Sequence, residues 1–239
     1  MRWIQKQDEP PKTLAKFLEE QLPVGLNLDY EHGFTRQKDL RLELIAEQLG
    51  LCGYTGAPVD DRLVKHTQPP DPGSKATKVR YSAHIEHLKP QSVCRQELID
   101  KGLEPGKDLG DDMNHKNMIA ALLVTGSDME MFGAVSRKNN PVPVWPTHQD
   151  CETRFSFDED GKIEGLDPDA IQTVTILKLD HTTLEGWRRS AIATFLSPEI
   201  IQTRDDVEQL VQRLDQPPDG KLVEFSFVVK SVAQALLNP

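Results

Sequence analysis

Two stretches of helical periodicity fill the first fifty residues of the chain. After the double proline at 10–11, leucine and phenylalanine recur at spacings of three and four residues, which predicts an amphipathic helix with Thr13 as its cap. Between Thr35, a suitable N-cap, and Gly50, a residue that ends helices, leucine and isoleucine again fall on one face. The N-terminal part is therefore expected to be helical.

The centre of the chain changes to strand-like patterning. Residues 79–88 and 117–124 are the two strand candidates, and a long connection separates them. That connection includes a short helix predicted over 94–101 and a loop rich in glycine and aspartate over 103–112. Residues 60–78, which precede the first strand, are predicted to form an irregular loop. The two strands are expected to pair as an antiparallel ribbon.

The C-terminal third begins with a hairpin and continues as helices. Residues 154–157 and 162–164 flank an acidic turn that ends in glycine, which predicts a short β-hairpin. Asp167 followed by proline marks a capped helix start. Further helices are predicted over 182–195, 198–214 and 221–237. The order of helices, a small strand-rich centre and helices again predicts an α+β fold with its chemistry in the centre.

The composition describes an acidic, globular chain. Its 239 residues include 28 lysines and arginines against 38 aspartates and glutamates, a net charge of -10, and 37% are hydrophobic. This is too apolar for a disordered chain, and no apolar run approaches the roughly 20 residues of a membrane helix or the core of a signal peptide. Three cysteines without a CxxC pair exclude a disulfide framework and a four-cysteine zinc site. We therefore expect a cytoplasmic protein without a membrane segment that does not coat nucleic acid nonspecifically.

One segment departs from this acidic balance. Between Arg62 and Arg95, seven lysine and arginine side chains stand against two carboxylates, a net charge of +5. Lys78, Arg80 and Lys89 belong to this segment. Two interpretations stay open: a solvated loop that acidic neighbours balance, or a strip beside the first strand that contacts phosphates.

A carboxylate and an imidazole stand next to each other at the end of the first strand. Glu86 directly precedes His87, and Pro90 closes the strand. On a strand, His84 and Glu86 share one face, while Ile85 and His87 share the other. Glu86 can hold a hard cation such as Mg2+ or Mn2+ through oxygen, and His87 can take a proton from water as a general base. The alternative is a surface strand with two polar histidines.

Two later segments give this pair a context. Asn117 opens the second strand, where its amide can orient the His87 ring or bind the metal. A basic segment follows at 137–140, where Lys138 can meet a phosphate. A strand with Glu-His, a strand with Asn and a basic segment, in this order, are typical of ββα-metal nucleases.

Three segments in this order resemble the HNH endonucleases of the PtuB type, the nuclease subunits of Septu anti-phage defence systems that also occur in some retron loci. These segments are 85–92, 112–121 and 132–139. The similarity covers most of residues 40–190, including a helix that runs into a Cys-x-Tyr turn and a later Leu-x-x-x-Arg helix. The resemblance implies a small ββα-metal core over 51–150, between an N-terminal helical segment over 1–50 and a hairpin and helical region over 151–239 packed on the core.

The resemblance also implies roles for individual residues. His87 matches the family's catalytic base and Glu86 its first metal ligand. Asn117 matches the family's central asparagine, for which the resemblance implies both a catalytic and a metal-binding role. Lys138 matches the catalytic lysine that follows the third motif position. The implied cofactor is Mg2+ or Mn2+. The side chains expected to contact nucleic acid are Lys78, Arg80, Lys89, Arg137 and Lys138.

Two positions depart from the family pattern. Val135 stands at the third motif position, where relatives often carry histidine or asparagine. Thr55 stands where a second cysteine would pair with Cys52, and Ala134 occupies a later cysteine position, so we expect no structural zinc. The third metal ligand stays open, and its candidates are His84, Asp112, Asn139, His148 and water.

Together these residues predict a metal-dependent hydrolase that cleaves nucleic-acid phosphodiesters, with DNA as the favoured substrate and tRNA as the other candidate. The resemblance implies an effector subunit that works with a PtuA-type ABC/SMC-like ATPase, through which a retron reverse transcriptase and its msDNA are further candidate partners. The alternative is a catalytically weak, HNH-derived scaffold subunit that binds and regulates the ATPase. Val135 and the acidic balance favour this alternative, and the fit of a divalent ion between Glu86 and Asn117 separates the two.

Overall fold

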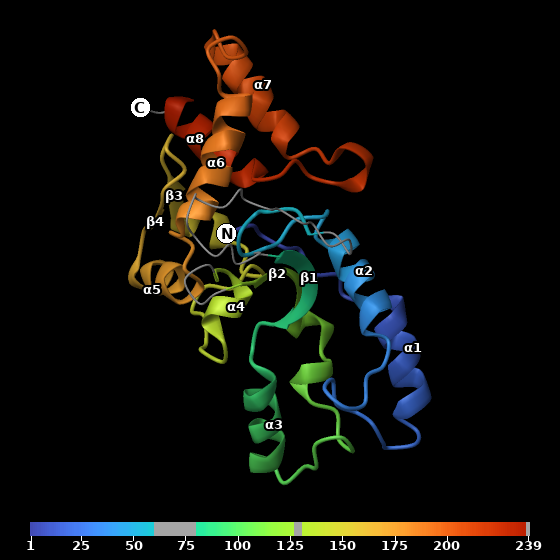
Figure 1. Ribbon diagram of the computed structural model, residues 1–239. Coiled ribbons are helices and arrows are strands. Elements are labelled where there is room, and N and C mark those ends of the chain that lie inside the picture. The colour runs from blue at the N-terminus through green and yellow to red at the C-terminus, as the bar shows by residue number, and fades with distance from the viewer. Residues whose placement is uncertain (60–79, 127–130, 238–239) are drawn as a thin grey trace.

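Eight α-helices and two small antiparallel sheets make up the part of the chain that the computed structural model describes, residues 1–59, 80–126 and 131–237 (Figure 1). The helices are α1 (Lys12–Gln21), α2 (Gln37–Glu47), α3 (Gln91–Asp100), α4 (Ala134–Arg137), α5 (Pro168–Leu177), α6 (Thr182–Phe195), α7 (Arg204–Leu214) and α8 (Ser226–Leu237). The strands are β1 (Arg80–His87), β2 (Met118–Thr125), β3 (Phe155–Phe157) and β4 (Ile163–Gly165). The α+β class predicted from the sequence is therefore confirmed, while the loop expected over 60–78 lies outside the described residues.

The predicted antiparallel ribbon is present in the register that its hydrophobic pattern requires. β1 pairs with β2 from Arg80 opposite Thr125 to His87 opposite Met118. At the start of β2, odd and even positions enter different cores, because side chains alternate across a strand, whereas both Leu122 and Val124 join the C-terminal core. Met118 and Ala120 pack with the N-terminal helices, whereas Ile119 and Ala121 pack with the C-terminal part of the chain.

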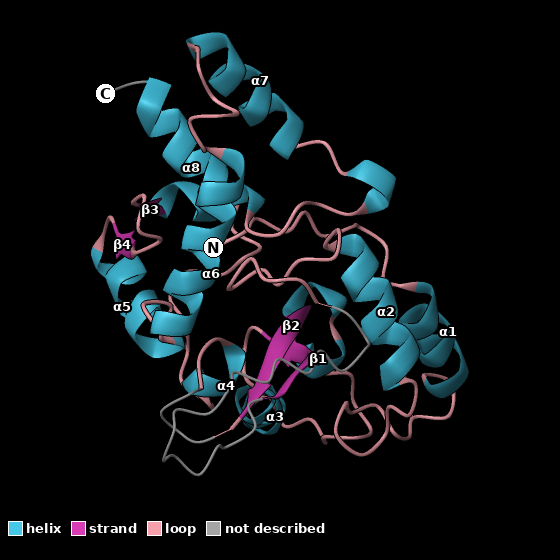
Figure 2. Cartoon of the chain, turned by 45° about the horizontal axis from the view of Figure 1, so that its top comes forward, coloured by secondary structure: helices cyan, strands magenta, loops and turns pink. Residues whose placement is uncertain are grey.

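The ribbon thus lies between two hydrophobic cores (Figure 2). On one face, Leu14 and Phe17 of α1 join Leu40 and Leu44 of α2. On the other face, a larger core is formed by residues of α4 to α8 and of the β3–β4 hairpin. Strands buried on both faces carry mostly apolar side chains, which explains the apolar run of β2. Polar side chains at the end of β1 are consequently the exception in this environment.

The outer edge of β2 is closed by side chains instead of a third strand. Gln48 accepts a hydrogen bond from the Ala120 N–H at 2.6 Å and donates one to the Ala120 carbonyl at 2.8 Å. Two residues before Ala120, the Met118 carbonyl accepts a hydrogen bond from Lys6 at 3.0 Å. Two residues after Ala120, the Leu122 N–H donates to the Cys52 sulfur at 3.4 Å. Four backbone groups of this edge, from Met118 to Leu122, are therefore satisfied without a neighbouring strand.

Two predicted caps near the N-terminus differ in the structure. Thr13 was predicted to cap the first helix, but α1 starts at Lys12, and the N–H and hydroxyl of Thr13 both donate to the carboxylate of Glu43 on α2. Thr35 was predicted to cap the second helix, but Arg36 is the N-cap and no side chain caps α2. Tertiary contacts with a distant carboxylate decided the role of Thr13, and local spacing does not show such contacts.

The caps of the C-terminal helices agree better with the caps predicted from the sequence. Asp167 caps α5 as predicted, because its carboxylate accepts a hydrogen bond from the Ala170 N–H at 3.0 Å. Helix α7 starts six residues later than predicted, where Thr203 and Asp206 form a capping box. None of the helices in the described ranges is long and apolar enough to cross a membrane.

The closure of the β2 edge predicts a large cost for the loss of one side chain. Gln48→Ala removes the bonds to Ala120 and leaves its buried N–H and carbonyl without partners, so we expect the free energy of unfolding to fall by about 2–4 kcal/mol. Urea denaturation measures this change. As a control, Gln209→Ala on the exposed side of α7 should change the free energy by less than about 0.5 kcal/mol. Equal stability of Gln48→Ala and the wild type would contradict the role of Gln48.

Candidate active site

The end of β1 directs its polar side chains to the two faces predicted from strand alternation. His84 and Glu86 share one face, where the His84 Nε2 and Glu86 Oε2 atoms are 3.3 Å apart. His87 points to the opposite face and meets the edge of the Tyr30 ring, with the ring centroids 4.5 Å apart. Glu86 and His87 are adjacent in the chain but occupy different environments.

His87 is buried, with 4% of its surface exposed, and both of its ring nitrogens have partners. Nε2 lies 2.9 Å from the Asp112 carbonyl, which can only accept, so Nε2 carries the hydrogen. Nδ1 lies 3.1 Å from the Gln91 amide nitrogen, which donates to the remaining lone pair. Burial lowers the pKa of His87, so the ring is neutral at pH 7. The structure therefore selects one neutral tautomer, with the basic lone pair on Nδ1.

Glu86 is held by an arginine from the short helix α4. The Arg137 Nε atom lies 2.7 Å from Glu86 Oε1, and the other two guanidinium nitrogens donate to the backbone carbonyls of His87 and Leu88. Arg137 is only 2% exposed. Its three contacts fix the end of β1 to α4. This internal position differs from the contact with nucleic acid that the sequence predicted for Arg137.

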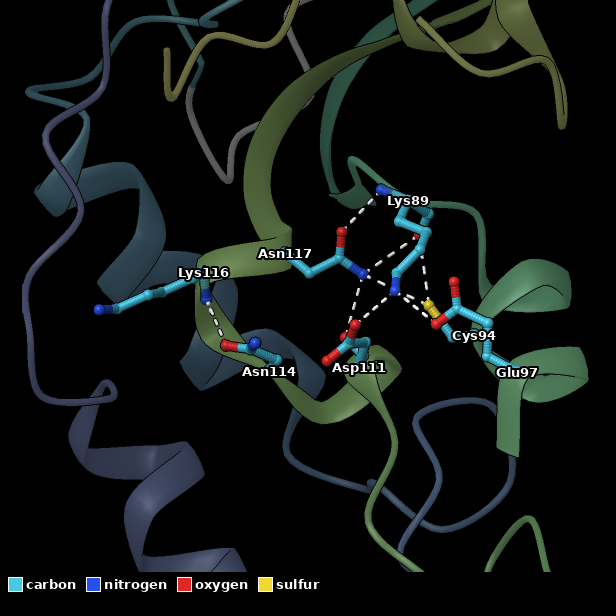
Figure 3. Close-up of polar contacts among 7 residues, drawn as sticks. All are labelled: Lys89, Cys94, Glu97, Asp111, Asn114, Lys116 and Asn117. Carbon is cyan, nitrogen blue, oxygen red and sulfur yellow. Dashed lines mark hydrogen bonds and ion pairs between the residues drawn. The ribbon is translucent and has the colours of Figure 1, made fainter. Parts of the chain in front are cut away.

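Asn117 joins the two backbone segments that flank the site (Figure 3). Its amide oxygen accepts a hydrogen bond from the Lys89 N–H at 2.6 Å. Its amide nitrogen donates to the carbonyls of Lys89 at 3.1 Å and Asp111 at 3.0 Å, and approaches the sulfur of Cys94 at 3.6 Å. Asn117 thereby ties the turn after β1 to the segment that carries the Asp112 carbonyl. It orients His87 through the backbone, and its amide oxygen accepts one hydrogen bond within this arrangement.

The other residues predicted to contact nucleic acid have different surroundings. Partial burial lowers the pKa of Lys89, but its hydrogen bonds to Asp111 and Glu97 outweigh this effect and raise the pKa to about 12. Lys89 therefore stays charged but is neutralised by two carboxylates, also drawn in Figure 3. Lys138 is exposed directly after α4. Lys78 and the side chain of Arg80 lie outside the described residues.

Two side chains on the Glu86 face, those of His84 and Glu86, are candidate ligands for one divalent ion. His84 Nε2 and Glu86 Oε2 contact each other at 3.3 Å, and one ion with ligand distances of about 2.1 Å would have to replace that hydrogen bond to contact both. Within the described ranges, His, Cys, Asp and Glu side chains form no cluster of three or more that could hold a metal. Water would therefore complete the shell, as is usual for Mg2+.

The remaining candidates for a third ligand are committed to other contacts or exposed. A carboxylate oxygen of Asp112 accepts a hydrogen bond from the Tyr30 N–H at 2.9 Å. The His148 Nδ1 atom accepts one from the Trp145 N–H at 3.3 Å, and Asn139 is exposed beyond α4. These placements leave His84 as the candidate whose donor atom lies next to Glu86.

Sequence reasoning did not identify two residues that contact His87. Gln91 is the first residue of α3, which starts three residues before the predicted helix because the Pro90 carbonyl accepts from the N–H groups of Val93 and Cys94. Tyr30 comes from the loop between α1 and α2. The proline before Gln91 was a usable signal for the helix start, whereas nothing in the local sequence connects Tyr30 to His87.

Comparison with known proteins adds no family to these observations, because no family model and no curated protein matches the chain significantly. The case for a function therefore depends on the residues and their geometry.

The clamp at Asn117 predicts a large loss of stability when its amide is changed. Asn117→Ala leaves the Lys89 N–H and two carbonyls without partners, so the free energy of unfolding should fall by about 3 kcal/mol. Asn117→Asp should lower the free energy of unfolding at least as much, because a carboxylate oxygen would then face the Lys89 and Asp111 carbonyls. Chemical denaturation measures both variants against Asn140→Ala, an exposed asparagine whose loss should cost less than about 0.5 kcal/mol. Similar stabilities for the Asn117 and Asn140 variants would refute the clamp.

Proposed function

We propose that this chain is a metal-dependent phosphodiesterase of the HNH class, with His87 as its general base. The observation that carries the proposal is the fixed tautomer of His87, whose Nε2–H points to the Asp112 carbonyl and whose lone pair is on Nδ1. An imidazole held in this way is prepared to accept a proton on Nδ1. The carboxylate–imidazole pair of Glu86 and His84, on the opposite face of β1, supports the metal requirement.

In the proposed reaction, Nδ1 of His87 takes a proton from the water that attacks phosphorus. The bond from Nε2–H to the Asp112 carbonyl then stabilises the positive ring, because the carbonyl dipole faces the charge. Glu86 and His84, on the other face of β1, are the residues that would hold Mg2+ or Mn2+, and such an ion would supply charge stabilisation at the phosphoryl group. Asn117 keeps the Asp112 carbonyl in place, so it acts as a positioning residue rather than as a metal ligand.

The arrangement of the elements also supports an HNH-type core within residues 51–150. β1, β2 and α4 follow each other in the order of a ββα-metal site, although α4 is a single turn of four residues. Arg137 of α4 forms an ion pair with Glu86 of β1, so the helix and the strand meet at the proposed ligand. Lys138, exposed directly after α4, is the proposed contact for a substrate phosphate.

The proposed substrate is DNA, with tRNA as the second candidate, since the reaction acts on a backbone that both share. The chain has a net charge of -10, and two carboxylates neutralise Lys89. Nucleic acid therefore has to bind through local positive charge, for which Lys138 and the basic segment that includes Lys78 and Arg80 are the candidates. Weak binding by the isolated chain follows from this charge distribution.

A second candidate function is a scaffold subunit without strong catalysis. Two observations favour it: Gln91 covers the Nδ1 atom of His87, and Arg137 neutralises Glu86. Val135, at the third motif position, adds no metal-binding group. In this case the protein would bind and regulate the ATPase rather than cut nucleic acid.

The nuclease proposal predicts that His87→Gln removes cleavage of plasmid DNA and total tRNA. Glutamine keeps a donor for the Asp112 carbonyl but has no basic nitrogen, so the rate should fall about 100-fold or more. Cleavage should require added Mg2+ or Mn2+ and should stop with EDTA. Incubation of the purified chain with each substrate in Mn2+, followed by electrophoresis, measures both effects.

His115→Gln is the matched control for this experiment. His115 is also buried and also places Nε2 near a backbone carbonyl, that of Gln7 at 3.0 Å, but it lies outside the proposed site. Its variant should cleave at the wild-type rate. Wild-type cleavage by His87→Gln would show that the base is assigned wrongly. Stoichiometric zinc in the purified protein would contradict the proposed hard-metal site.

We further propose that the protein acts in the cytoplasm in complex with a PtuA-type ATPase, through its acidic C-terminal helices. The segment 197–215 has a net charge of -3. Asp206 caps α7 and Asp215 pairs with Lys230, whereas Glu199 and Asp205 are exposed. A retron reverse transcriptase with its msDNA would join through the ATPase.

Co-expression with the ATPase tests this partner by size-exclusion chromatography at moderate salt. The pair should elute together, and Glu199→Lys with Asp205→Lys should weaken the complex about fivefold, since two exposed ion pairs contribute about 1 kcal/mol together. Glu159→Lys with Glu164→Lys, at exposed positions of the β3–β4 hairpin, is the control that should bind as the wild type does. Separate elution of the two wild-type proteins would refute the partner.

A further inference from the structure

A cavity of about 330 Å3, lined mostly by residues with polar or charged side chains, lies beside the proposed base but does not touch it. Its lining includes Gln91, Ser92 and Arg95 of α3, together with Asp29, His32 and Asp112. His87 is absent from the described residues that line the cavity, although both groups bonded to its ring, Gln91 and Asp112, are present. The Gln91 side chain therefore separates the cavity from the His87 ring.

Gln91 covers the atom that the proposed reaction needs. Its amide nitrogen donates to His87 Nδ1 at 3.1 Å, so a water molecule cannot use the same lone pair while this bond exists. A glutamine side chain has three rotatable bonds, and Gln91 is half-buried at the start of α3, where it can turn without moving the helix. The cavity provides room for the displaced amide group.

Other groups around His87 are engaged elsewhere and do not compete for Nδ1. An Asp112 carboxylate oxygen accepts from the Tyr30 N–H, and Glu86 pairs with Arg137 on the far side of the ribbon. The Tyr30 ring packs edge-on against the imidazole. Gln91 alone among these described neighbours contacts Nδ1.

We propose that Gln91 is a positioning residue that holds His87 in one tautomer and covers Nδ1 until its amide swings into the cavity. The cavity then becomes the route by which water and the phosphodiester reach the base. This inference rests on the proposed function for its role in cleavage, whereas the cover itself depends only on the geometry around the ring. The displacement of the Gln91 amide would precede proton transfer to His87.

The cover is tested by the reaction of histidines with diethyl pyrocarbonate at one fixed pH, followed by peptide mass spectrometry. This reagent modifies an accessible imidazole nitrogen. In Gln91→Ala, His87 should react about fivefold faster than in the wild type, the factor expected for the loss of one neutral hydrogen bond. His148 is exposed and His115 is buried, and neither lines the cavity, so both provide internal references whose rates should not change.

Two further variants separate the hydrogen bond from a general loosening of the fold. Gln96→Ala lies on the same helix, where Gln96 bonds Asp100 and not His87, and should leave the His87 rate unchanged. Gln91→Met keeps the length of the side chain without the N–H, and it replaces Gln91→Ala if that variant does not fold. In Gln91→Met, nitrogen-15 NMR should show a changed Nδ1 signal with an unchanged Nε2–H signal, an effect that a purely structural role would not produce.

The outcomes distinguish this inference from the proposed function. An unchanged His87 rate in folded Gln91→Ala, or an equal rise for His115, would overturn the cover even if the wild type cleaves nucleic acid. A faster His87 reaction together with about fivefold faster cleavage supports both. A faster His87 reaction without cleavage by any variant supports the cover and refutes the nuclease.

Discussion

The side-chain amide of Asn117 is the interaction on which the geometry at the end of β1 depends. It bonds the backbone on both sides of a long connection, at Lys89 and at Asp111. Because the next carbonyl, that of Asp112, accepts the His87 hydrogen, the clamp sets the ring position without touching the ring. A buried amide with every bond satisfied favours one arrangement strongly, since each unsatisfied group would cost about 1–3 kcal/mol. The Asn117 amide oxygen uses one of its two lone pairs in this clamp, to accept the Lys89 N–H.

Local pattern predicted the elements of this fold well, because the elements obey local rules. The alternation of β1 placed Glu86 and His87 on opposite faces, and the apolar run of β2 indicated a strand, which the structure buries on both sides. The predicted helix start was wrong where the expected capping side chain binds a distant partner instead, as Thr13 binds Glu43. The contacts of Gln48 with Ala120 join residues that are far apart in the chain, and no spacing rule reveals them.

Charge counts were a weaker guide to the site than residue order. The segment from Arg62 to Arg95 has a local net charge of +5, yet Lys89 is neutralised by Asp111, which lies outside that segment, as well as by Glu97. Arg137 sits in a basic stretch of sequence but is buried against Glu86. A count of charges along the chain omits the carboxylates that folding brings close. The order of the Glu-His pair and the asparagine, in contrast, identified residues that the structure does bring to one strand end.

The closed edge of β2 has a consequence for assembly. An open strand edge presents unpaired N–H and carbonyl groups that recruit a strand from another chain. Here Lys6, Gln48 and Cys52 occupy those groups at alternate residues of β2. A partner or a second copy therefore cannot pair with β2 along Met118–Leu122 without displacing these side chains, which thus protect this stretch against edge-to-edge aggregation.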